Sequence, residues 1–194
     1  MDFNLPEELQ MLKDTVRKFV DKELIPIEMH TIENMELKPD IRDRLEKKTK
    51  EMGLWMFDVP EEYGGSGLSS LAQVLVWEEL ARTVALPSRG QGIFGPEIRP
   101  ILYALDDEQK KRFLDPIRNG EKKLCFMQTE PDAGSDPASM KTRAVRQGDY
   151  YIVNGTKRFI TGAGEADFGQ LMAVTDPAKG AHGGISCFMV DMKT

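Results

Sequence analysis

The chain has 194 residues, enough for one full domain and a smaller second one, and its composition is that of an ordinary globular protein. Its 32 acidic residues outnumber its 26 Lys and Arg residues, so we expect no nucleic-acid partner and no general attraction to an anionic membrane surface. No apolar stretch is long enough to predict a membrane span.

The two cysteines, Cys125 and Cys187, are too few for a disulfide framework, and each lies in an apolar run. Buried, inert thiols in a reducing compartment are therefore expected. The acidic N-terminus is unlike a basic signal leader. These features predict a cytoplasmic protein, or one of the mitochondrial matrix if the source is eukaryotic.

The first 120 residues predict an all-helical domain, because apolar positions recur at spacings of three and four. The helix that Ser69 or Ser70 caps is apolar around most of its circumference, which predicts a place in the middle of a bundle. Asp106 is the expected N-cap of the last helix. The predicted helices cover residues 6–24, 27–35, 39–52, 70–82, 96–105 and 107–117.

From Lys123 onward the pattern changes to short segments rich in β-branched and aromatic residues, which predicts a domain of antiparallel strands over residues 121–194. Asn154-Gly155 predicts a hairpin, because both residues accept the positive φ of a type I′ turn. Helices followed by strands indicate an α+β protein with two domains, 1–120 and 121–194. The predicted strands cover residues 123–128, 140–146, 150–153, 156–161, 170–175 and 185–190.

The last predicted strand ends close to Thr194 and leaves an open hydrogen-bonding edge. We therefore expect the chain to be the front part of a longer protein, or to be completed by another chain. Metal binding is not predicted, because His30 and His182 have no partner at ligand spacing. A Gly-x-Ser-x-Gly hydrolase motif is also absent from the sequence, and no Gly-x-Gly-x-x-Gly motif joins a predicted strand to a predicted helix.

Two predicted strands end in polar residues that suggest a binding site. The first is followed by Thr129 and Ser135, and the second ends in Phe159 and Thr161. Taken singly, the hydroxyls fit ordinary turn residues and Phe159 fits a core aromatic. Taken together, the threonines could meet the edge of one flat ring, with Phe159 against its face and Gly134 and Ser135 beside a phosphate or carbonyl oxygen.

The residues at these strand ends resemble the flavin-binding core of the acyl-CoA dehydrogenase family. The resemblance covers essentially the whole chain and implies a helical N-terminal domain, then a β-barrel-like middle domain, incomplete at its C-terminus, that binds FAD. The matching runs are Phe126-Met-Gln-Thr-Glu-Pro-Asp-Ala-Gly-Ser-Asp136, Tyr150-Tyr-Ile-Val-Asn-Gly-Thr-Lys-Arg-Phe-Ile-Thr-Gly162, Val59-Pro-Glu-Glu-Tyr-Gly-Gly-Ser-Gly67 and Asp107-Glu-Gln-Lys-Lys-Arg-Phe-Leu114.

The resemblance also implies roles for individual residues. Thr129 would lie on the pyrimidine side of the flavin, Thr161 near N5, and Phe159 where many members have tryptophan. Ser135 would lie between the flavin and the pantetheine of an acyl-CoA thioester, and Phe94 and Ile98 would line the acyl pocket. The residues expected at the cofactor are Phe126, Met127, Gln128, Thr129, Gly134, Ser135, Phe159, Ile160 and Thr161.

Family members oxidise acyl-CoA thioesters with FAD and a glutamate base, and pass the electrons to an electron-transfer flavoprotein. That base lies in a C-terminal helical domain outside this chain, so no catalytic residue is assigned, and Glu130 is expected to be structural. We expect weak or no FAD retention and no turnover by the 194 residues alone, and a homodimer or homotetramer for the complete protein. The alternatives are a flavin oxidase or monooxygenase of the same fold, and a non-catalytic interaction module.

Overall fold

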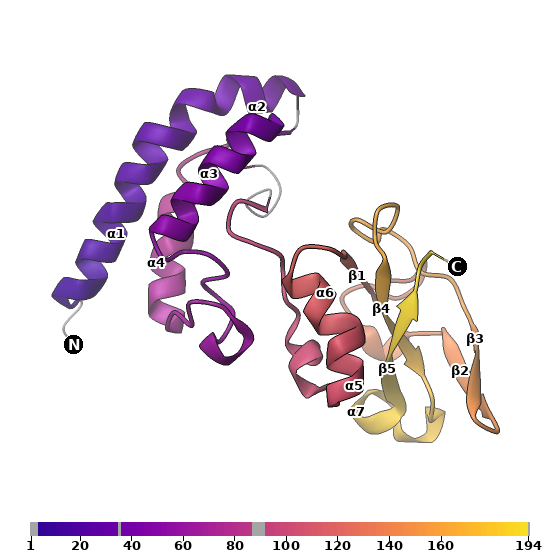
Figure 1. Ribbon diagram of the computed structural model, residues 1–194. Coiled ribbons are helices and arrows are strands. Elements are labelled where there is room, and N and C mark those ends of the chain that lie inside the picture. The colour runs from indigo at the N-terminus through magenta and orange to yellow at the C-terminus, as the bar shows by residue number, and fades with distance from the viewer. Residues whose placement is uncertain (1–3, 35, 87–91, 194) are drawn as a thin grey trace. The chain divides into compact units, whose positions relative to one another are not determined.

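The computed structural model describes residues 4–34, 36–86 and 92–193. It divides into two compact units, Met1–Glu97 and Ile98–Thr194, which are coloured indigo to magenta and magenta to yellow in Figure 1. The first unit is helical and the second contains the sheet, so the expected α+β class is confirmed.

The helical unit is built from the helices that the periodicity predicts. α1 continues through the π-helical turn η1 and the 3-10 turn η2 into α2, and the side chain of Ser69 caps α4 by accepting a hydrogen bond from the Ala72 N–H. The elements are α1 (Glu7–Phe19), η1 (Val20–Leu24), η2 (Ile25–Ile27), α2 (Glu28–Asn34), α3 (Pro39–Glu51), η3 (Glu61–Tyr63) and α4 (Ser70–Leu80).

The core of this unit is a cluster of aliphatic and aromatic side chains. Phe57 lies at its centre, with its ring centroid 5.7 Å from that of Phe94 and 5.2 Å from that of Trp77. Val16, Leu24 and Leu45 have no exposed surface. Burying such side chains contributes roughly 1.5–3 kcal/mol each, which is the main stabilisation of the unit.

The expectation that α4 lies in the middle of a bundle is wrong for the described residues. Leu71, Val74 and Trp77 are 50%, 60% and 43% exposed, whereas Leu75 and Val76 are buried. The helix is apolar on two faces, but only one of them is covered within this unit. The sequence pattern reports apolar content and does not show which face another element covers.

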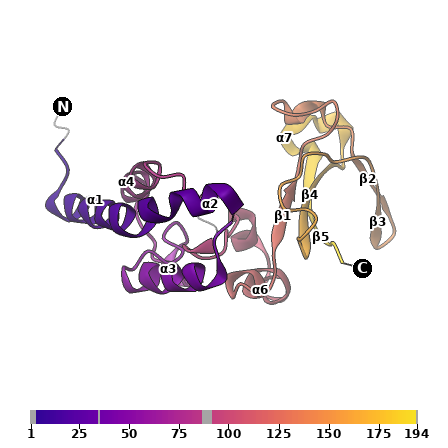
Figure 2. The ribbon, with the colours of Figure 1, turned by 90° about the horizontal axis from the view of Figure 1, so that it is seen from above.

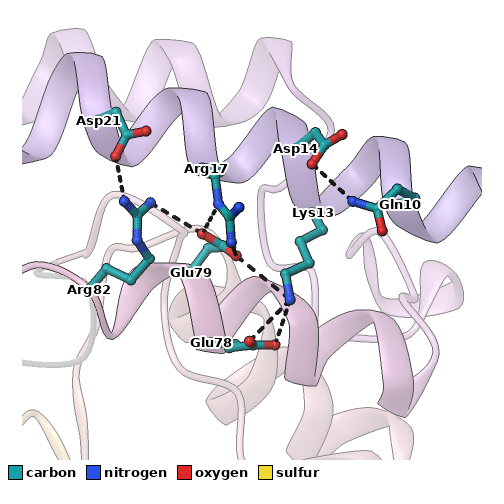
Figure 3. A network of polar contacts seen from close by, with 8 residues as sticks. All are labelled: Gln10, Lys13, Asp14, Arg17, Asp21, Glu78, Glu79 and Arg82. Carbon is teal, nitrogen blue, oxygen red and sulfur yellow. Dashed lines mark hydrogen bonds and ion pairs between the residues drawn. The ribbon is translucent and has the colours of Figure 1, made fainter. Parts of the chain in front are cut away.

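A polar network joins α1 to α4 (Figure 3). Glu79 of α4 has no exposed surface, and its carboxylate accepts hydrogen bonds from Arg17 Nε at 3.0 Å, Arg17 Nη2 at 2.7 Å and Arg82 Nη1 at 3.2 Å. These hydrogen bonds, with the Arg17 bonds contributing most, lower the pKa of Glu79 against the opposing effect of burial. The buried carboxylate is therefore ionised at neutral pH.

The second unit begins with helical turns that pack on its sheet. The predicted helix over residues 96–105 is wrong in extent, because only η5 (Pro100–Ala104) is helical and its turns are 3-10. The next helix is confirmed, and Asp106 caps it by accepting from the Gln109 N–H. Its segments are α5 (Asp107–Gln109), η6 (Lys110–Leu114) and α6 (Asp115–Arg118). The rings of Phe113 and Phe168 meet edge to face at 5.0 Å and join this helix to the sheet.

The sheet has five strands and is mixed rather than wholly antiparallel. β1 and β2 pair with β4 in parallel, and β5 pairs with β4 antiparallel. Figure 2 shows β1, β4 and β5 side by side. β2 meets β4 at one pair only, Arg143 with Val174. The elements are β1 (Leu124–Met127), η7 (Pro137–Ser139), β2 (Arg143–Gln147), β3 (Tyr150–Asn154), β4 (Phe168–Val174), η8 (Pro177–Lys179), the turn α7 (Ala181–Gly184) and β5 (Ile185–Asp191).

The hairpin lies one strand earlier than the Asn154-Gly155 pattern predicts. β2 and β3 are joined by Gly148 and Asp149, and Gly148 has a φ of +63°, which suits the first position of a two-residue turn. The predicted strand over residues 156–161 is also wrong, since the chain there is irregular. β3 therefore runs into a loop that returns toward β1.

Gly155 has a packing role in place of the expected turn role. A Cβ at this position would lie 2.2 Å from Thr142 Oγ1 and 2.7 Å from its Cα. We expect Gly155→Ala to lower the free energy of unfolding by about 1–3 kcal/mol through overpacking. Gly164→Ala is the control, because nothing lies within 4 Å of its Cβ. Urea unfolding followed by circular dichroism measures both, and equal midpoints would contradict the close approach.

Candidate functional site

The structure brings the end of β1 and the irregular segment over residues 157–161 together within the second unit. The Arg158 N–H donates to the Thr129 carbonyl at 3.0 Å, and Lys157 Nζ donates to the Gln128 carbonyl at 2.9 Å. The loop after β3 thus lies against the end of β1. We call this region the strand-end site, made of residues 126–129, 134–135 and 159–161.

Three hydroxyls at this site have no hydrogen-bond partner among the described residues. In the part of the chain that the structure describes, the side chains of Thr129, Ser135 and Thr161 make no hydrogen bond. Ser135 and Thr161 are exposed and Thr129 is half-buried. The ordinary role of such hydroxyls in capping local backbone donors is therefore not observed. Gly134, beside Ser135, is exposed as well, so a ligand can approach its backbone.

Phe159 is not a core residue. Its side chain is 78% exposed, and its φ of +57° is a left-handed conformation that costs a bulky residue roughly 1–2 kcal/mol. The Arg158 guanidinium lies 4.0 Å from the ring centroid. An exposed aromatic in a strained conformation is typical of binding sites, where surrounding structure holds the strain.

The other residues of the site support it from within. Successive residues of β1 point to opposite faces, so Phe126 lies 5.2 Å below the Arg99 guanidinium while Met127 is buried with Cys125. Ile160 packs against the cluster that contains Met127, and Gln128 is half-buried. Residues 126–129 can therefore contact a single ring only through their backbone and through the side chains that lie on one face of the strand.

The two residues expected at an acyl pocket are buried. Phe94 belongs to the core of the helical unit and Ile98 to the second unit, and each is 7% exposed. The family resemblance implies that the loop and helix over residues 90–105 shape part of that pocket, and residues 90–91 lie outside the described residues. The acyl-pocket role of Phe94 and Ile98 stays a prediction.

A buried ion pair beside the site was missed by the sequence analysis. Lys157 Nζ lies 2.8 Å from Glu130 Oε1, and their side chains are 8% and 4% exposed. Burial opposes ionisation of Glu130, but hydrogen bonds from Lys157 and from the Lys141 and Thr142 N–H groups outweigh it and lower its pKa to about 2. The available signal was the presence of an acid, Glu130, and a lysine, Lys157, in the two segments that form the site.

Both parts of the sequence match known protein domains. Residues 6–121 match the acyl-CoA dehydrogenase N-terminal domain, and residues 125–194 match the acyl-CoA dehydrogenase middle domain. The helices and the mixed sheet thus agree with the first two domains of this class of oxidoreductase. The chain belongs to the acyl-CoA dehydrogenase family.

Known relatives match this sequence along nearly its whole length. The short-chain specific acyl-CoA dehydrogenase of Rattus norvegicus mitochondria is 38% identical over 194 residues, covering 98% of this chain and 45% of the relative. Caffeyl-CoA reductase-Etf complex subunit CarC of Acetobacterium woodii is 38% identical, covering 97% of this chain and 49% of CarC. The chain therefore spans about half the length of these relatives.

Solved structures give the same fold. The acyl-CoA dehydrogenase of Geobacillus kaustophilus superposes with a TM-score of 0.69 at 35% identity, covering all of this chain and 50% of that one. The FAD complex of PigA superposes with a TM-score of 0.72 at 28% identity, covering 98% of this chain and 49% of that one. Among the described residues, no helix is long and apolar enough to cross a membrane.

Proposed function

We propose that the strand-end site binds FAD and that the complete protein is an acyl-CoA dehydrogenase. It would oxidise the Cα–Cβ bond of an acyl-CoA thioester and pass the electrons to an electron-transfer flavoprotein. The exposed, left-handed Phe159 is the single observation that supports this most directly. The family, the relative named as part of an Etf complex and the FAD-bound neighbour support the same proposal.

The residues present fit an isoalloxazine ring. Phe159 offers an aromatic face, and the free hydroxyls of Thr129 and Thr161 can donate to the ring edge. Ser135 is exposed and available to the pantetheine part of a thioester. Bound FAD would supply hydride acceptance, and the residues of this chain would bind and orient it.

The buried Glu130 is not proposed as the base. Its carboxylate accepts hydrogen bonds from Lys157 and from the Lys141 and Thr142 N–H groups, and at a pKa of about 2 it is a poor proton acceptor. We therefore propose that these 194 residues bind FAD weakly and do not turn over a thioester by themselves.

Several further parts of the proposal concern the complete protein. We propose a homodimer or homotetramer, a place in fatty acid metabolism, and a cytoplasmic or mitochondrial-matrix location. We also propose a sequence boundary after residue 120 between the two domains, which the limits of the matched domains, 6–121 and 125–194, support. The compact units divide earlier because the helix over residues 107–118 packs on the sheet.

The decisive experiment is an FAD titration followed by flavin fluorescence anisotropy. We expect saturable binding, and we expect Phe159→Ala to weaken it about two- to tenfold, because aromatic stacking contributes about 0.5–1.5 kcal/mol. Phe159→Trp should retain binding. The control is Tyr150→Ala, which removes a ring that is 61% exposed on β3, outside the site.

The complete natural protein provides the functional readout. Its bound flavin should bleach when an acyl-CoA is added without oxygen. A complete protein that neither holds FAD nor responds to acyl-CoA would refute the proposal, and rapid oxygen consumption would favour the oxidase alternative.

A further inference from the structure

The Glu130–Lys157 pair differs from the other ion pairs of the described residues in that both side chains are less than one tenth exposed. In the other ion pairs that these residues form, at least one side chain is 18% exposed or more. Burying two opposite charges costs desolvation free energy, and apolar residues of the same volume often stabilise a fold equally well. The pair therefore calls for an explanation other than stability alone.

The two charged groups hold three separate segments by their backbone. Glu130 Oε1 accepts from the Thr142 N–H at 3.0 Å, and Oε2 accepts from the Lys141 N–H at 2.6 Å. Lys157 Nζ donates to the Gln128 carbonyl at 2.9 Å. The end of β1, the start of β2 and the loop after β3 thus meet at one buried ion pair.

The residues next to this pair are the ones that face the strand-end site. Thr129 lies between Gln128 and Glu130, and Phe159 lies two residues after Lys157. The Arg158 N–H, between Lys157 and Phe159, donates to the Thr129 carbonyl at 3.0 Å. With its ring 78% exposed, Phe159 has little packing of its own to fix its position. Its left-handed backbone also needs support from its neighbours.

We propose that Glu130 and Lys157 are positioning residues that set the distance and angle between Thr129 and Phe159, and so shape the strand-end site for a planar ring. The inference rests on the proposed function for the identity of that ring, FAD. Lys157 fixes the Gln128 carbonyl, Glu130 fixes the backbone at Lys141 and Thr142, and the ion pair locks the two halves together. Neither residue needs to touch the ligand for this role.

Two variants separate positioning from stability. Lys157→Met leaves the buried carboxylate unpaired, whereas Glu130→Gln/Lys157→Met removes both charges and should recover most of the lost stability. We expect both to bind FAD at least tenfold more weakly than wild type, since neither restores the bond to the Gln128 carbonyl. Phe113→Leu, which loosens the contact with Phe168 outside the site, should bind within twofold of wild type.

The FAD titrations use the complete natural protein and its variants, under conditions in which every variant is folded. If the double variant regained both stability and FAD affinity, the pair would be merely structural and the inference would be overturned. Hydrogen exchange without FAD gives a second readout. Lys157→Met should speed exchange at residues 127–130 and 157–161 together, and unchanged exchange there would refute the positioning role even if wild type bound no FAD. Absence of FAD binding by wild type would instead refute the proposed function.

Discussion

Glu79→Gln should lower the free energy of unfolding of the helical unit by about 2–3 kcal/mol, because hydrogen bonds to charged groups contribute more than neutral ones. The amide keeps the shape of the side chain but leaves Arg17 and Arg82 without their shared buried carboxylate (Figure 3). Both tryptophans, Trp55 and Trp77, lie in this unit, so tryptophan fluorescence during urea unfolding reports on it directly.

The neighbouring acid is a matched control. Glu78 pairs with Lys13 at 3.0 Å, but its side chain is 56% exposed, so Glu78→Gln should change the stability by no more than about 0.5 kcal/mol. Because the pKa of Glu79 is lowered, its contribution is present above the ordinary pKa of a glutamate and is lost as the pH falls. Equal urea midpoints for the two variants would show that burial of Glu79 does not matter.

Acidification should destabilise the second unit by about 3 kcal/mol through Glu130 alone. The carboxyl has a pKa of about 2 in the folded chain, against 4.5 ordinarily, and each unit of pKa difference corresponds to about 1.4 kcal/mol. The folded pKa is lowered, so the contribution is complete above the ordinary value and is lost as the pH falls toward 2. Hydrogen exchange of the β4 amides as a function of pH measures this loss.

Glu130→Gln provides the comparison for that titration. It should be less stable than wild type at neutral pH and should lose the part of the pH dependence that Glu130 supplies. The other carboxyls remain in both proteins, so the difference between the two curves isolates this group. Parallel curves between about pH 5 and pH 2 would show that Glu130 does not titrate as its buried hydrogen bonds require.

Local signals in the sequence determined most of the elements. Apolar spacing of three and four fixes one face of a helix, so α1, α3 and α4 fall where the periodicity predicts them. Caps such as Ser69 and Asp106 act on their own helix and can be read from a few residues. The two polar motifs were likewise expected to lie together, and they do, but through the loop after β3, whose Arg158 N–H donates to the Thr129 carbonyl, and not through the ends of two strands.

Tertiary structure decided what depends on distant partners. The parallel pairing of β1 with β4 and the open face of α4 follow from which elements meet, and no local pattern records that. Gly155 was read as a turn residue, but its approach to Thr142 shows its packing role. In the sequence, Lys157 is one more polar residue of a predicted strand. In the fold, it lies against Glu130, 27 residues away in sequence. Hydrogen bonds from Lys157, Lys141 and Thr142 lower the pKa of Glu130 against the effect of burial, and the assembled fold is what brings these groups together.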